Sequence, residues 1–206
     1  MTAYRTEQEA FWSGEFGDEY SARNTGAGWV AANTALFTKI LARTSRVESA
    51  IEFGANIGLN LMALRHLLPA ARLGAVEINP SAVEALRGWG GCEEVIQESI
   101  LNYVPTSSYD LAFTKGVLIH INPDELGSVY EILYRSSHRY VLVAEYYNPS
   151  PVEIPYRGHS GRLFKRDFAG EMLDTYSDLR LVDYGFAWKR DPQFPQDDLT
   201  WFLLEK

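Results

Sequence analysis

The sequence predicts an α/β fold in which helices cover a mostly parallel β-sheet, and three observations predict it. Apolar, strand-like runs alternate with helical patterns from about residue 48 onward, as a parallel sheet with crossover helices requires. The run 51–60 passes from a short strand through a glycine-containing turn into an amphipathic helix. An acid, Glu77, then closes the next apolar run. Together these features indicate half of a site for a nucleotide-type cofactor.

Composition limits the class of protein. At 206 residues and 46% hydrophobic content, the chain fits one globular domain with one core. A single cysteine, Cys92, excludes a disulfide framework and a thiolate metal cluster within the chain, and the four scattered histidines predict no metal site. A polar N-terminus and the lack of a long apolar run predict a cytoplasmic protein without membrane insertion. The net charge of -8 argues against a broad nucleic-acid surface, and we expect a monomer or homodimer.

The elements of the core follow from periodicity and from end signals. Strands are expected near 48–54, 72–77, 92–97, 109–114 and 138–145, and helices over 60–68, about 80–87 and 122–136. The pairs Asn79-Pro80 and Asn122-Pro123 mark two helix starts, because asparagine caps helix N-termini and proline suits the first turn. Pro69 follows the first helix as a stop signal.

The two ends of the chain add helices and a hairpin. Helices are expected over about 7–22, 29–43 and 168–176. Strand-like runs at 179–186 and 199–204 predict a hairpin on the sheet edge. We therefore divide a single domain, 1–206, into a helical N-terminal cap at 1–45, a cofactor-binding core at 46–145, and an acceptor loop with the C-terminal sheet edge at 146–206.

Three cofactors are compatible with the strand, the glycine turn and the following acid: nicotinamide, flavin and S-adenosylmethionine. A dinucleotide site typically has three glycines in a G-x-G-x-x-G run, whereas this turn has only Gly54 and Gly58. Glu52, just before the turn, would repel a phosphate and attract an ammonium group. S-adenosylmethionine carries an ammonium and a sulfonium and lacks phosphate, so the sequence favours it.

The segment Glu52-x-Gly54-x-Asn56-x-Gly58 resembles the acidic, glycine-rich first motif of class I S-adenosylmethionine-dependent methyltransferases, and the run 109–123 resembles their fourth motif. Asn56 stands where glycine is commoner, but asparagine tolerates a left-handed backbone. The resemblance implies a Rossmann-like class I methyltransferase fold. Such a fold has a mostly parallel seven-stranded sheet with an antiparallel C-terminal strand, helices on both faces and an N-terminal helical cap.

Segments outside this common core resemble one subfamily more closely. The stretches 11–24, 114–123, 144–151 and 156–159 are similar to the methylases found with pseudaminic acid biosynthesis, over nearly the whole chain. This resemblance implies a small polar acceptor, such as an amino or acidic sugar of the nonulosonate type or a nucleotide-linked intermediate.

The resemblance to methyltransferases also implies the residues that hold S-adenosylmethionine. Glu77 would accept hydrogen bonds from the ribose hydroxyls, Ile78 would pack on the adenine, and Lys115 would line the methionine end. Glu98 departs from the aspartate that is usual beside the adenine amino group. The full predicted cofactor set is Tyr20, Glu52, Gly54, Ala55, Asn56, Gly58, Asn60, Glu77, Ile78, Asn79, Glu98, Ser99, Ile100, Lys115, Gly116 and Val117.

His120 is the predicted base of the acceptor site, because its ordinary pKa lies near neutrality and it follows the methionine-binding loop. A purely structural histidine is the alternative. The predicted acceptor-binding set is Arg23, Asn24, His120, Glu145, Tyr147, Asn148, Tyr156, Arg157 and His159. The segment 145–148 follows the fifth strand, where open α/β sheets bind ligands. The alternative is that its first tyrosine belongs to the core and that the rest is only a turn. The basic segment 157–166 suits a carboxylate or phosphate, or pairs with the protein's own acids.

The predicted function is methyl transfer from S-adenosylmethionine to a small polar acceptor. Another N- or O-methyltransferase of small metabolites, a nicotinamide oxidoreductase and a cofactor-binding regulatory module remain the alternatives.

Overall fold

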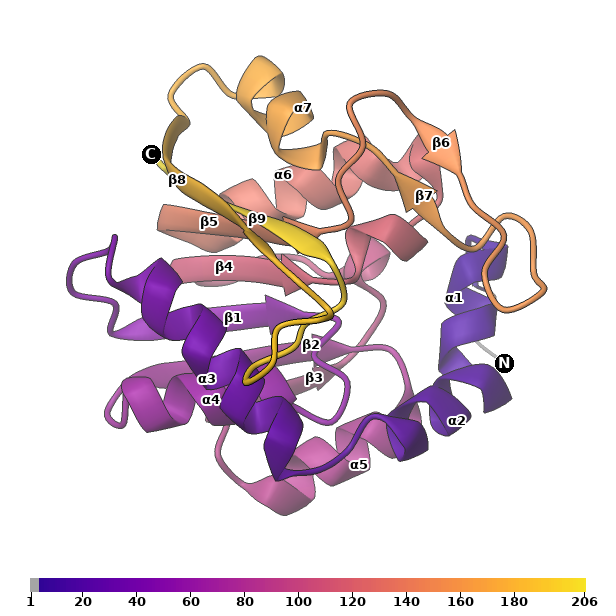
Figure 1. Ribbon diagram of the computed structural model, residues 1–206, viewed down its shortest axis with the longest axis horizontal. Helices are drawn as coiled ribbons and strands as arrows, with labels where there is room; N and C mark the ends of the chain where they lie inside the picture. Colours follow the sequence, from indigo (N-terminus) through magenta and orange to yellow (C-terminus); the bar gives the residue numbers. More distant parts are fainter. Residues whose placement is uncertain (1–3) are drawn as a thin grey trace.

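The sheet is the centre of the molecule and has seven strands in the order β3-β2-β1-β4-β5-β9-β8 (Figure 1). The computed structural model describes residues 4–206, so the first three residues of the expected N-terminal cap lie outside the described part. The strands are β1 (Ser49–Phe53), β2 (Arg72–Glu77), β3 (Glu94–Gln97), β4 (Tyr109–Lys115), β5 (Ser137–Glu145), β8 (Arg180–Ala187) and β9 (Leu199–Glu205). Of these, β9 is antiparallel to both of its neighbours, which confirms the predicted C-terminal hairpin.

Helices cover both faces of the sheet. One buried cluster packs α3 (Ala27–Leu41), α4 (Leu59–Leu67) and α5 (Pro80–Trp89) on one face. The other packs α6 (Leu126–Ser136) and α7 (Phe168–Thr175) on the opposite face, with the short turn η1 (Ile100–Asn102). The side chains alternate between the clusters, since Ile51 and Phe53 face one and Ala50 faces the other.

The helix signals in the sequence act as predicted around α5. The Asn79 side chain accepts a hydrogen bond from the Ala82 amide, Pro80 takes the first helical position, and Gly90 ends the helix with a φ of 71°. The start predicted at Asn122 instead forms a short 3-10 turn, η3 (Pro123–Glu125), before α6 begins.

The prediction of one N-terminal helix over 7–22 is wrong. Two helices, α1 (Glu7–Ser13) and α2 (Glu15–Arg23), meet at Gly14, whose backbone is extended with a φ of -104° and a ψ of -158°. Glycine has a low helix propensity, so an interruption of the helix at this position costs little free energy. The bend allows α1 and α2 to fold over the carboxyl ends of the strands (Figure 1).

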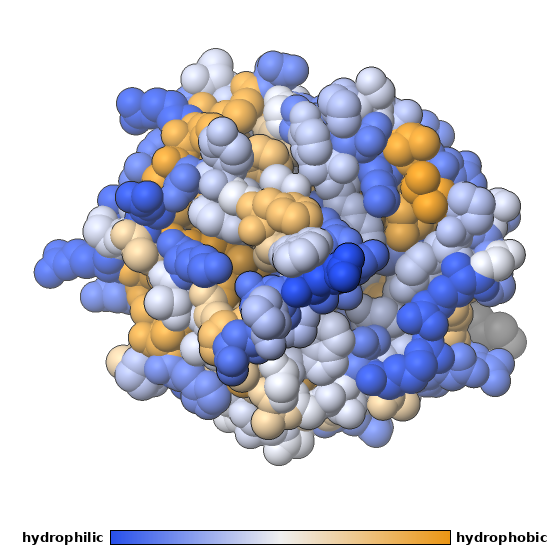
Figure 2. Space-filling model, viewed as in Figure 1, coloured by the Kyte–Doolittle hydropathy of each residue, from blue (hydrophilic) through white to orange (hydrophobic). Residues whose placement is uncertain are grey.

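A small hairpin that the sequence did not predict extends from the end of β5. It pairs β6 (Val152–Glu153) with β7 (Phe164–Lys165). Val152 and Ile154 are exposed in it, and apolar side chains appear on the upper right of the molecule, where this hairpin lies (Figure 2). The loop between its strands reaches α1, because the Gln8 Nε2 donates to the Gly161 carbonyl at 2.9 Å.

Within residues 4–206, no helix is both long enough and apolar enough to cross a lipid bilayer. The same part of the chain has no cluster of three or more histidine, cysteine or acidic side chains arranged to hold a metal ion.

Candidate active site

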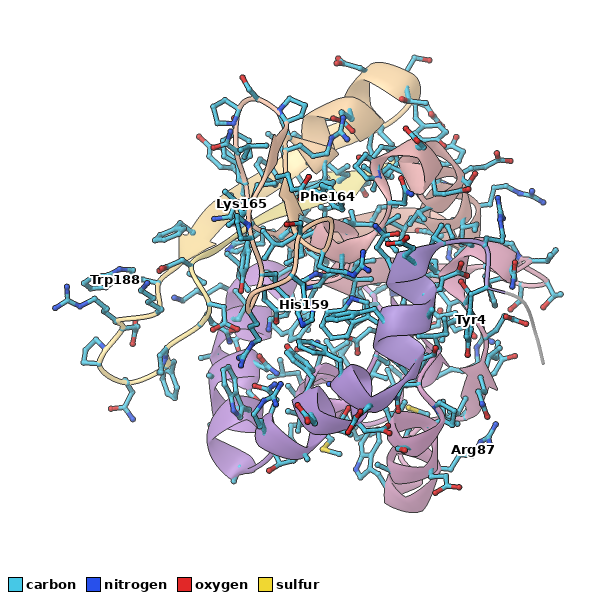
Figure 3. All side chains as sticks on the ribbon, turned by 90° about the vertical axis from the view of Figure 1, so that its right-hand side faces the viewer. Tyr4, Arg87, His159, Phe164, Lys165 and Trp188 are labelled. Carbon is cyan, nitrogen blue, oxygen red and sulfur yellow. The ribbon has the colours of Figure 1, made fainter. Side chains whose placement is uncertain are left out.

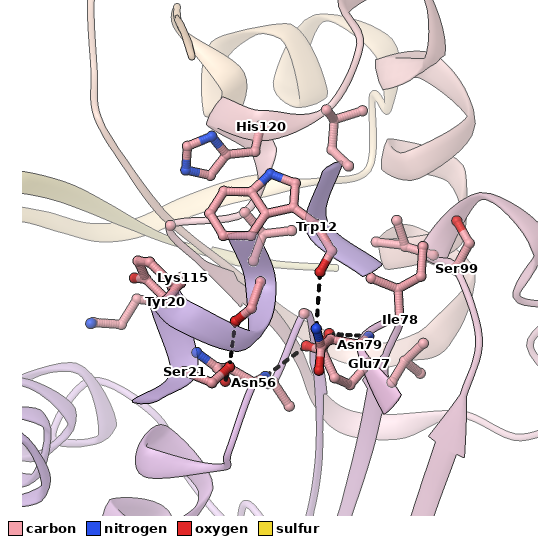
Figure 4. Close-up of a pocket in the computed structure, with 18 of the residues that line it drawn as sticks. Trp12, Tyr20, Ser21, Asn56, Glu77, Ile78, Asn79, Ser99, Lys115 and His120 are labelled. Carbon is pink, nitrogen blue, oxygen red and sulfur yellow. Dashed lines mark hydrogen bonds between the residues drawn. The ribbon is translucent and has the colours of Figure 1, made fainter. Parts of the chain in front are cut away.

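A cavity of about 200 Å³ lies at the carboxyl ends of β1, β2 and β4, under α1 and α2 (Figure 4). The chain order along the sheet reverses between β1 and β4, which is where open α/β sheets bind ligands. The cavity therefore occupies the place where the sequence predicts a cofactor.

The turn after β1 forms the floor of the cavity. Gly54 has a φ of 72° and Asn56 a φ of 48°, so both take the left-handed conformation expected from the sequence. A Cβ atom on residue 54 would stand 2.6 Å from a methyl group of Val117, so this position has no room for a side chain. Gly116 also has a positive φ, of 69°, and open space beside it. A ligand can thus approach the backbone at Gly116, whereas Val117 fills the space beside Gly54.

Glu77 at the end of β2 is buried and fixed by the backbone on both sides. Its Oε2 accepts from the Asn56 amide and its Oε1 from the Asn79 amide, each at 2.7 Å (Figure 4). Burial raises the pKa of this carboxyl group, and these two hydrogen bonds oppose the rise. Each carboxylate oxygen can accept a second hydrogen bond, so Glu77 can still receive two hydroxyl donors from a ligand.

Glu52 and Asn60 form a buried polar pair beneath the glycine turn, and Asn60 lines the cavity. The Asn60 Nδ2 donates to the Glu52 Oε1 at 2.6 Å, while the Glu52 Oε2 and the Asn60 Oδ1 have no partner among the described residues. Burial raises the pKa of Glu52 to about 8 and lowers that of the Lys115 ammonium group. Asn60 and Lys115 line the cavity, whereas Glu52 and Gly58 do not. The Asn60 Oδ1 is therefore a buried acceptor without a donor at this end of the cavity.

Glu145 holds the loop that follows β4. Its Oε1 accepts from the amides of Val117 and Leu118, both at 3.1 Å, and its Oε2 from the Ile119 amide at 3.5 Å. Burial raises the pKa of Glu145 to about 7, and these amides oppose the rise. Since the side chain lies under the loop and does not line the cavity, its geometry fits positioning better than the acceptor contact expected from the sequence.

His120 ends the short turn η2 (Leu118–His120) and faces the cavity. Its Nδ1 lies 2.5 Å from the Arg162 carbonyl. A carbonyl only accepts, so Nδ1 carries the proton and Nε2 keeps its lone pair. Burial lowers the pKa of His120 to about 4, so the ring is neutral at pH 7. The rings of Trp12 and Tyr156 pack against it, with centroids 4.6 and 5.0 Å away.

Helices α1 and α2 form a lid that is fastened to the floor of the cavity. The Ser21 hydroxyl donates to the Asn56 Oδ1 at 2.6 Å, and the Asn79 Nδ2 donates to the Trp12 carbonyl at 3.2 Å and to Asp18 at 2.9 Å (Figure 4). The lid thus rests on the two residues whose amides hold Glu77.

Comparison with known proteins gives matches in structure. No protein-family profile matches the sequence, and no curated protein matches it. The magnesium protoporphyrin IX methyltransferase of Synechocystis PCC 6803 with bound SAH superposes with a TM-score of 0.71 at 10% identity, over 97% of this chain and 100% of that one. The Burkholderia thailandensis 1,6-didemethyltoxoflavin-N1-methyltransferase, with its acceptor and S-adenosylhomocysteine, gives 0.70 at 15% identity, over 100% and 93% of the two chains.

A further match is the mitomycin 7-O-methyltransferase, with a TM-score of 0.65 at 17% identity. It covers 98% of this chain, which spans 61% of the length of that enzyme. These matches cover 97–100% of this chain, including its seven-stranded sheet with the antiparallel C-terminal hairpin. The chain has the class I methyltransferase fold.

In this class I methyltransferase fold, most of the predicted cofactor set comes together. Fourteen of its sixteen residues line the cavity, namely Tyr20, Gly54, Ala55, Asn56, Asn60, Glu77, Ile78, Asn79, Glu98, Ser99, Ile100, Lys115, Gly116 and Val117. The two others, Glu52 and Gly58, lie directly behind them.

The predicted acceptor set is largely dispersed. Only Asn24 and His120 line the cavity, whereas Arg23, Glu145, Tyr147, Asn148, Tyr156, Arg157 and His159 do not. Tyr156 still contacts the ring of His120. His159 is exposed in the hairpin loop and contacts Phe11 of the lid, with ring centroids 5.1 Å apart (Figure 3).

Sequence reasoning missed several residues of the wall. Gln8, Glu9, Trp12, Trp29, Asn33 and Asp197 also line the cavity. The aromatic run at 11–20 was the one signal that pointed to the lid, and no local pattern marked Asn33 or Asp197.

Proposed function

We propose that the protein transfers a methyl group from S-adenosylmethionine to a small polar acceptor. The observation that carries this proposal has two parts. Glu77, beside the glycine turn, accepts hydrogen bonds from two backbone amides. At the other end of the turn, the Asn60 Oδ1 is buried without a donor. A ribose suits the first feature, because its two hydroxyls match the two carboxylate oxygens. An ammonium suits the second, because Asn60 Oδ1 is buried without a donor. Structures with the same fold that hold SAH support the proposal.

Each end of the cofactor has residues of fitting chemistry in this cavity. Ile78 and Ile100 offer apolar surface for the adenine, with Ser99 beside them. Asn60 and Lys115 offer an acceptor and a cation for the amino-acid end, and Gly116 leaves its backbone open to it. The cofactor supplies the methyl group on a sulfonium, and the neutral thioether that remains is a good leaving group. The chain then has to align the acceptor and exclude water, and alignment alone supplies several kcal/mol.

We assign His120 to the acceptor. The Arg162 carbonyl fixes its tautomer, so the Nε2 lone pair is available to accept a proton or a hydrogen bond from the incoming group. With a pKa near 4, the ring is a weak base and remains neutral throughout the physiological range. This suits an acceptor that needs orientation more than deprotonation.

The finer proposal is an acceptor of the nonulosonate or nucleotide-linked sugar type, which the resemblance to pseudaminic acid-associated methylases implies. Two of the basic residues that were expected to bind an acidic sugar pair with the protein's own acids, which disfavours an acidic group at this site. Arg162 pairs with Glu7 at 3.1 Å and Arg166 with Glu171 at 2.6 Å, and neither lines the cavity. We therefore place an amino or neutral sugar ahead of an acidic one.

Calorimetry tests the donor half of this proposal. We expect S-adenosylhomocysteine to bind and NAD⁺ not to bind. Glu77→Gln should weaken S-adenosylhomocysteine by about tenfold or more, since a hydrogen bond to a charged group contributes about 1.5–3 kcal/mol. Glu84→Gln, exposed on α5, is the matched control and should bind as the wild type does. Binding of NAD⁺ in preference to S-adenosylhomocysteine would falsify the proposal.

Turnover tests the acceptor half. Labelled S-adenosylmethionine incubated with a panel of amino sugars, neutral sugars and their nucleotide-linked forms should yield labelled product. His120→Ala should lower that turnover by about 10²-fold with S-adenosylhomocysteine affinity retained, because it removes a group that aligns the acceptor and a misplacement of about 1 Å can cost that much. Unchanged turnover in His120→Ala would assign this histidine to packing alone.

A further inference from the structure

Asp197 is an acid of the cavity wall that the proposed function leaves without a role. It lies in the loop between β8 and β9 and reaches the cavity from the C-terminal part of the chain. The other carboxylates of the wall are engaged: Glu9 in the cap of α1, Glu77 by two amides and Glu98 by the Ser99 amide. Within residues 4–206, Asp197 has neither a hydrogen bond nor an ion pair. It is a carboxylate presented to the cavity without a partner.

The loop around Asp197 is anchored on both sides. Before it, Gln196 is buried, donates from its Nε2 to the Asn33 Oδ1 at 3.0 Å, and donates from its amide to the Trp188 carbonyl at 3.1 Å. After it, Asp198 has a φ of 53° and accepts from the Lys189 amide at 2.9 Å. Residues on either side are thus tied to α3 and to the start of the loop, while Asp197 itself is exposed toward the cavity.

The charge of Asp197 acts on groups at the amino-acid and acceptor end of the cavity. Burial raises the pKa of Tyr20 to about 12, and the charges on Tyr156 and Asp197 add to the rise. Asp197 also opposes the fall in the pKa of Lys115 that burial causes. Lys115 and Asp197 nevertheless form no ion pair within 4 Å in the described part of the chain. Tyr20, on which the charge of Asp197 acts, packs against Trp12 with ring centroids 5.3 Å apart, so aromatic surface lines the same cavity as the free carboxylate.

The remaining charges of the wall favour a cation over an anion. Lys115 is the basic residue that lines the cavity, together with the neutral His120, whereas the arginines of the neighbourhood are engaged elsewhere or exposed. A carboxylate next to aromatic faces attracts an ammonium group, both by its charge and through the ring quadrupoles. An acidic ligand at this point would face Asp197 at close range.

We infer that Asp197 binds a protonated amino group of the methyl acceptor and selects acceptors that carry one. The inference rests on the proposed methyl transfer and concerns how the acceptor is held. The bound ammonium has no lone pair, so the methyl group goes to another atom of the acceptor. Asp197 is then a specificity-determining residue that distinguishes amines from alcohols and acids of the same shape.

The test uses three probes of one size and three charges: 2-aminoethanol, ethylene glycol and glycolate. Their affinities are measured by NMR titration of the protein saturated with S-adenosylhomocysteine, for the wild type, Asp197→Asn and the control Asp174→Asn. Asp174 is an exposed acid on α7 and does not line the cavity. We expect the wild type and the control to bind 2-aminoethanol about tenfold more tightly than the other probes, as one charge-assisted hydrogen bond implies.

In Asp197→Asn this preference should disappear, while S-adenosylhomocysteine affinity stays within about twofold of the wild type. Equal binding of the three probes by the wild type, or an amine preference that persists in Asp197→Asn, overturns the inference. A tenfold loss of S-adenosylhomocysteine affinity in Asp197→Asn overturns it too, because the carboxylate would then belong to the cofactor's ammonium. Failure of the wild type to bind S-adenosylhomocysteine is a separate result that counts against the proposed function.

Discussion

At the scale of single residues, the site is built from ionisable groups whose burial opposes their charge. Burial raises the pKa of Glu52 to about 8 and that of Glu145 to about 7, and lowers that of His120 to about 4. Glu52 is the extreme case, since one of its oxygens has only the Asn60 amide and the other has no partner among the described residues. Such a residue costs stability once it is charged, because a buried carboxylate without a full set of partners is unfavourable.

This cost predicts an unusual pH dependence. The Glu52 carboxyl has a pKa near 4.5 in the unfolded chain and, because of burial, about 8 in the fold. Between these values the folded protein keeps a proton that the unfolded chain releases, so this group's contribution to the free energy of unfolding falls as the pH rises. Glu52→Gln should flatten that fall and raise the free energy of unfolding at pH 8 by at least about 1 kcal/mol, since one pKa unit corresponds to about 1.4 kcal/mol.

Urea unfolding at pH 5, 6.5 and 8 measures the effect of Glu52→Gln. The control is Glu48→Gln, at an exposed position just before β1, which should keep the wild-type profile. A Glu52→Gln profile parallel to that of the wild type at all three pH values would show that Glu52 is charged in the fold.

At the scale of elements, the lid of α1 and α2 depends on the bend at Gly14 and on close contact at Gly17. A Cβ atom on residue 17 would stand 1.9 Å from the Trp12 carbonyl and 2.8 Å from the Asn79 Nδ2. The Asn79 side chain caps α5 and its amide holds Glu77, so the lid, a core helix and the cofactor acid share one residue. Closure of the lid and occupation of the cavity should therefore favour each other.

Gly17→Ala should open this arrangement. The added methyl group has to displace backbone, which costs about 1–3 kcal/mol in a packed contact. We expect faster amide hydrogen exchange in α1 and α2 with little change in the sheet, and weaker binding of S-adenosylhomocysteine. The matched control is Gly28→Ala in α3, where an added Cβ meets nothing within 4 Å. Equal exchange in α1 and α2 for both variants would mean that the lid does not depend on this contact.

The elements also show where sequence reasoning works and where it stops. The glycine turn, the cap at Asn79 and the acid at Glu77 are encoded locally, so the floor of the cavity could be predicted. The wall could not, because its partners are remote in sequence: Gln8 contacts Gly161 and Gln196 contacts Asn33. Tyr147 was placed in the site because it follows the fifth strand, which does end at Glu145, but its side chain is exposed and its ring lies beside that of Phe202.

At the scale of the whole molecule, the cavity joins the beginning, middle and end of the chain. Trp12 comes from the lid, Glu77 from the centre of the sheet, and Asp197 from the loop before the last strand. A cofactor in the cavity lies between the lid and the sheet, and an acceptor adds the loop of Asp197, so their binding energy should stabilise the whole fold against unfolding. The size of this effect follows from mass action alone.

At a concentration about one hundred times its dissociation constant, S-adenosylhomocysteine should add about 2.7 kcal/mol to the free energy of unfolding. For a chain of this length, each kcal/mol raises the melting temperature by about 2–4 °C, so we expect a rise of about 5–10 °C.

Scanning fluorimetry at increasing ligand concentration measures this rise, with adenosine and NAD⁺ as comparisons. Adenosine should give a smaller rise in melting temperature, because it lacks an ammonium group that could donate a hydrogen bond to the Asn60 Oδ1. A rise with NAD⁺ and none with S-adenosylhomocysteine would assign the cavity to a dinucleotide. Two separate transitions in the presence of S-adenosylhomocysteine would show that the lid and the sheet unfold independently, because a ligand held between Trp12 of the lid and Glu77 of the sheet should leave only one.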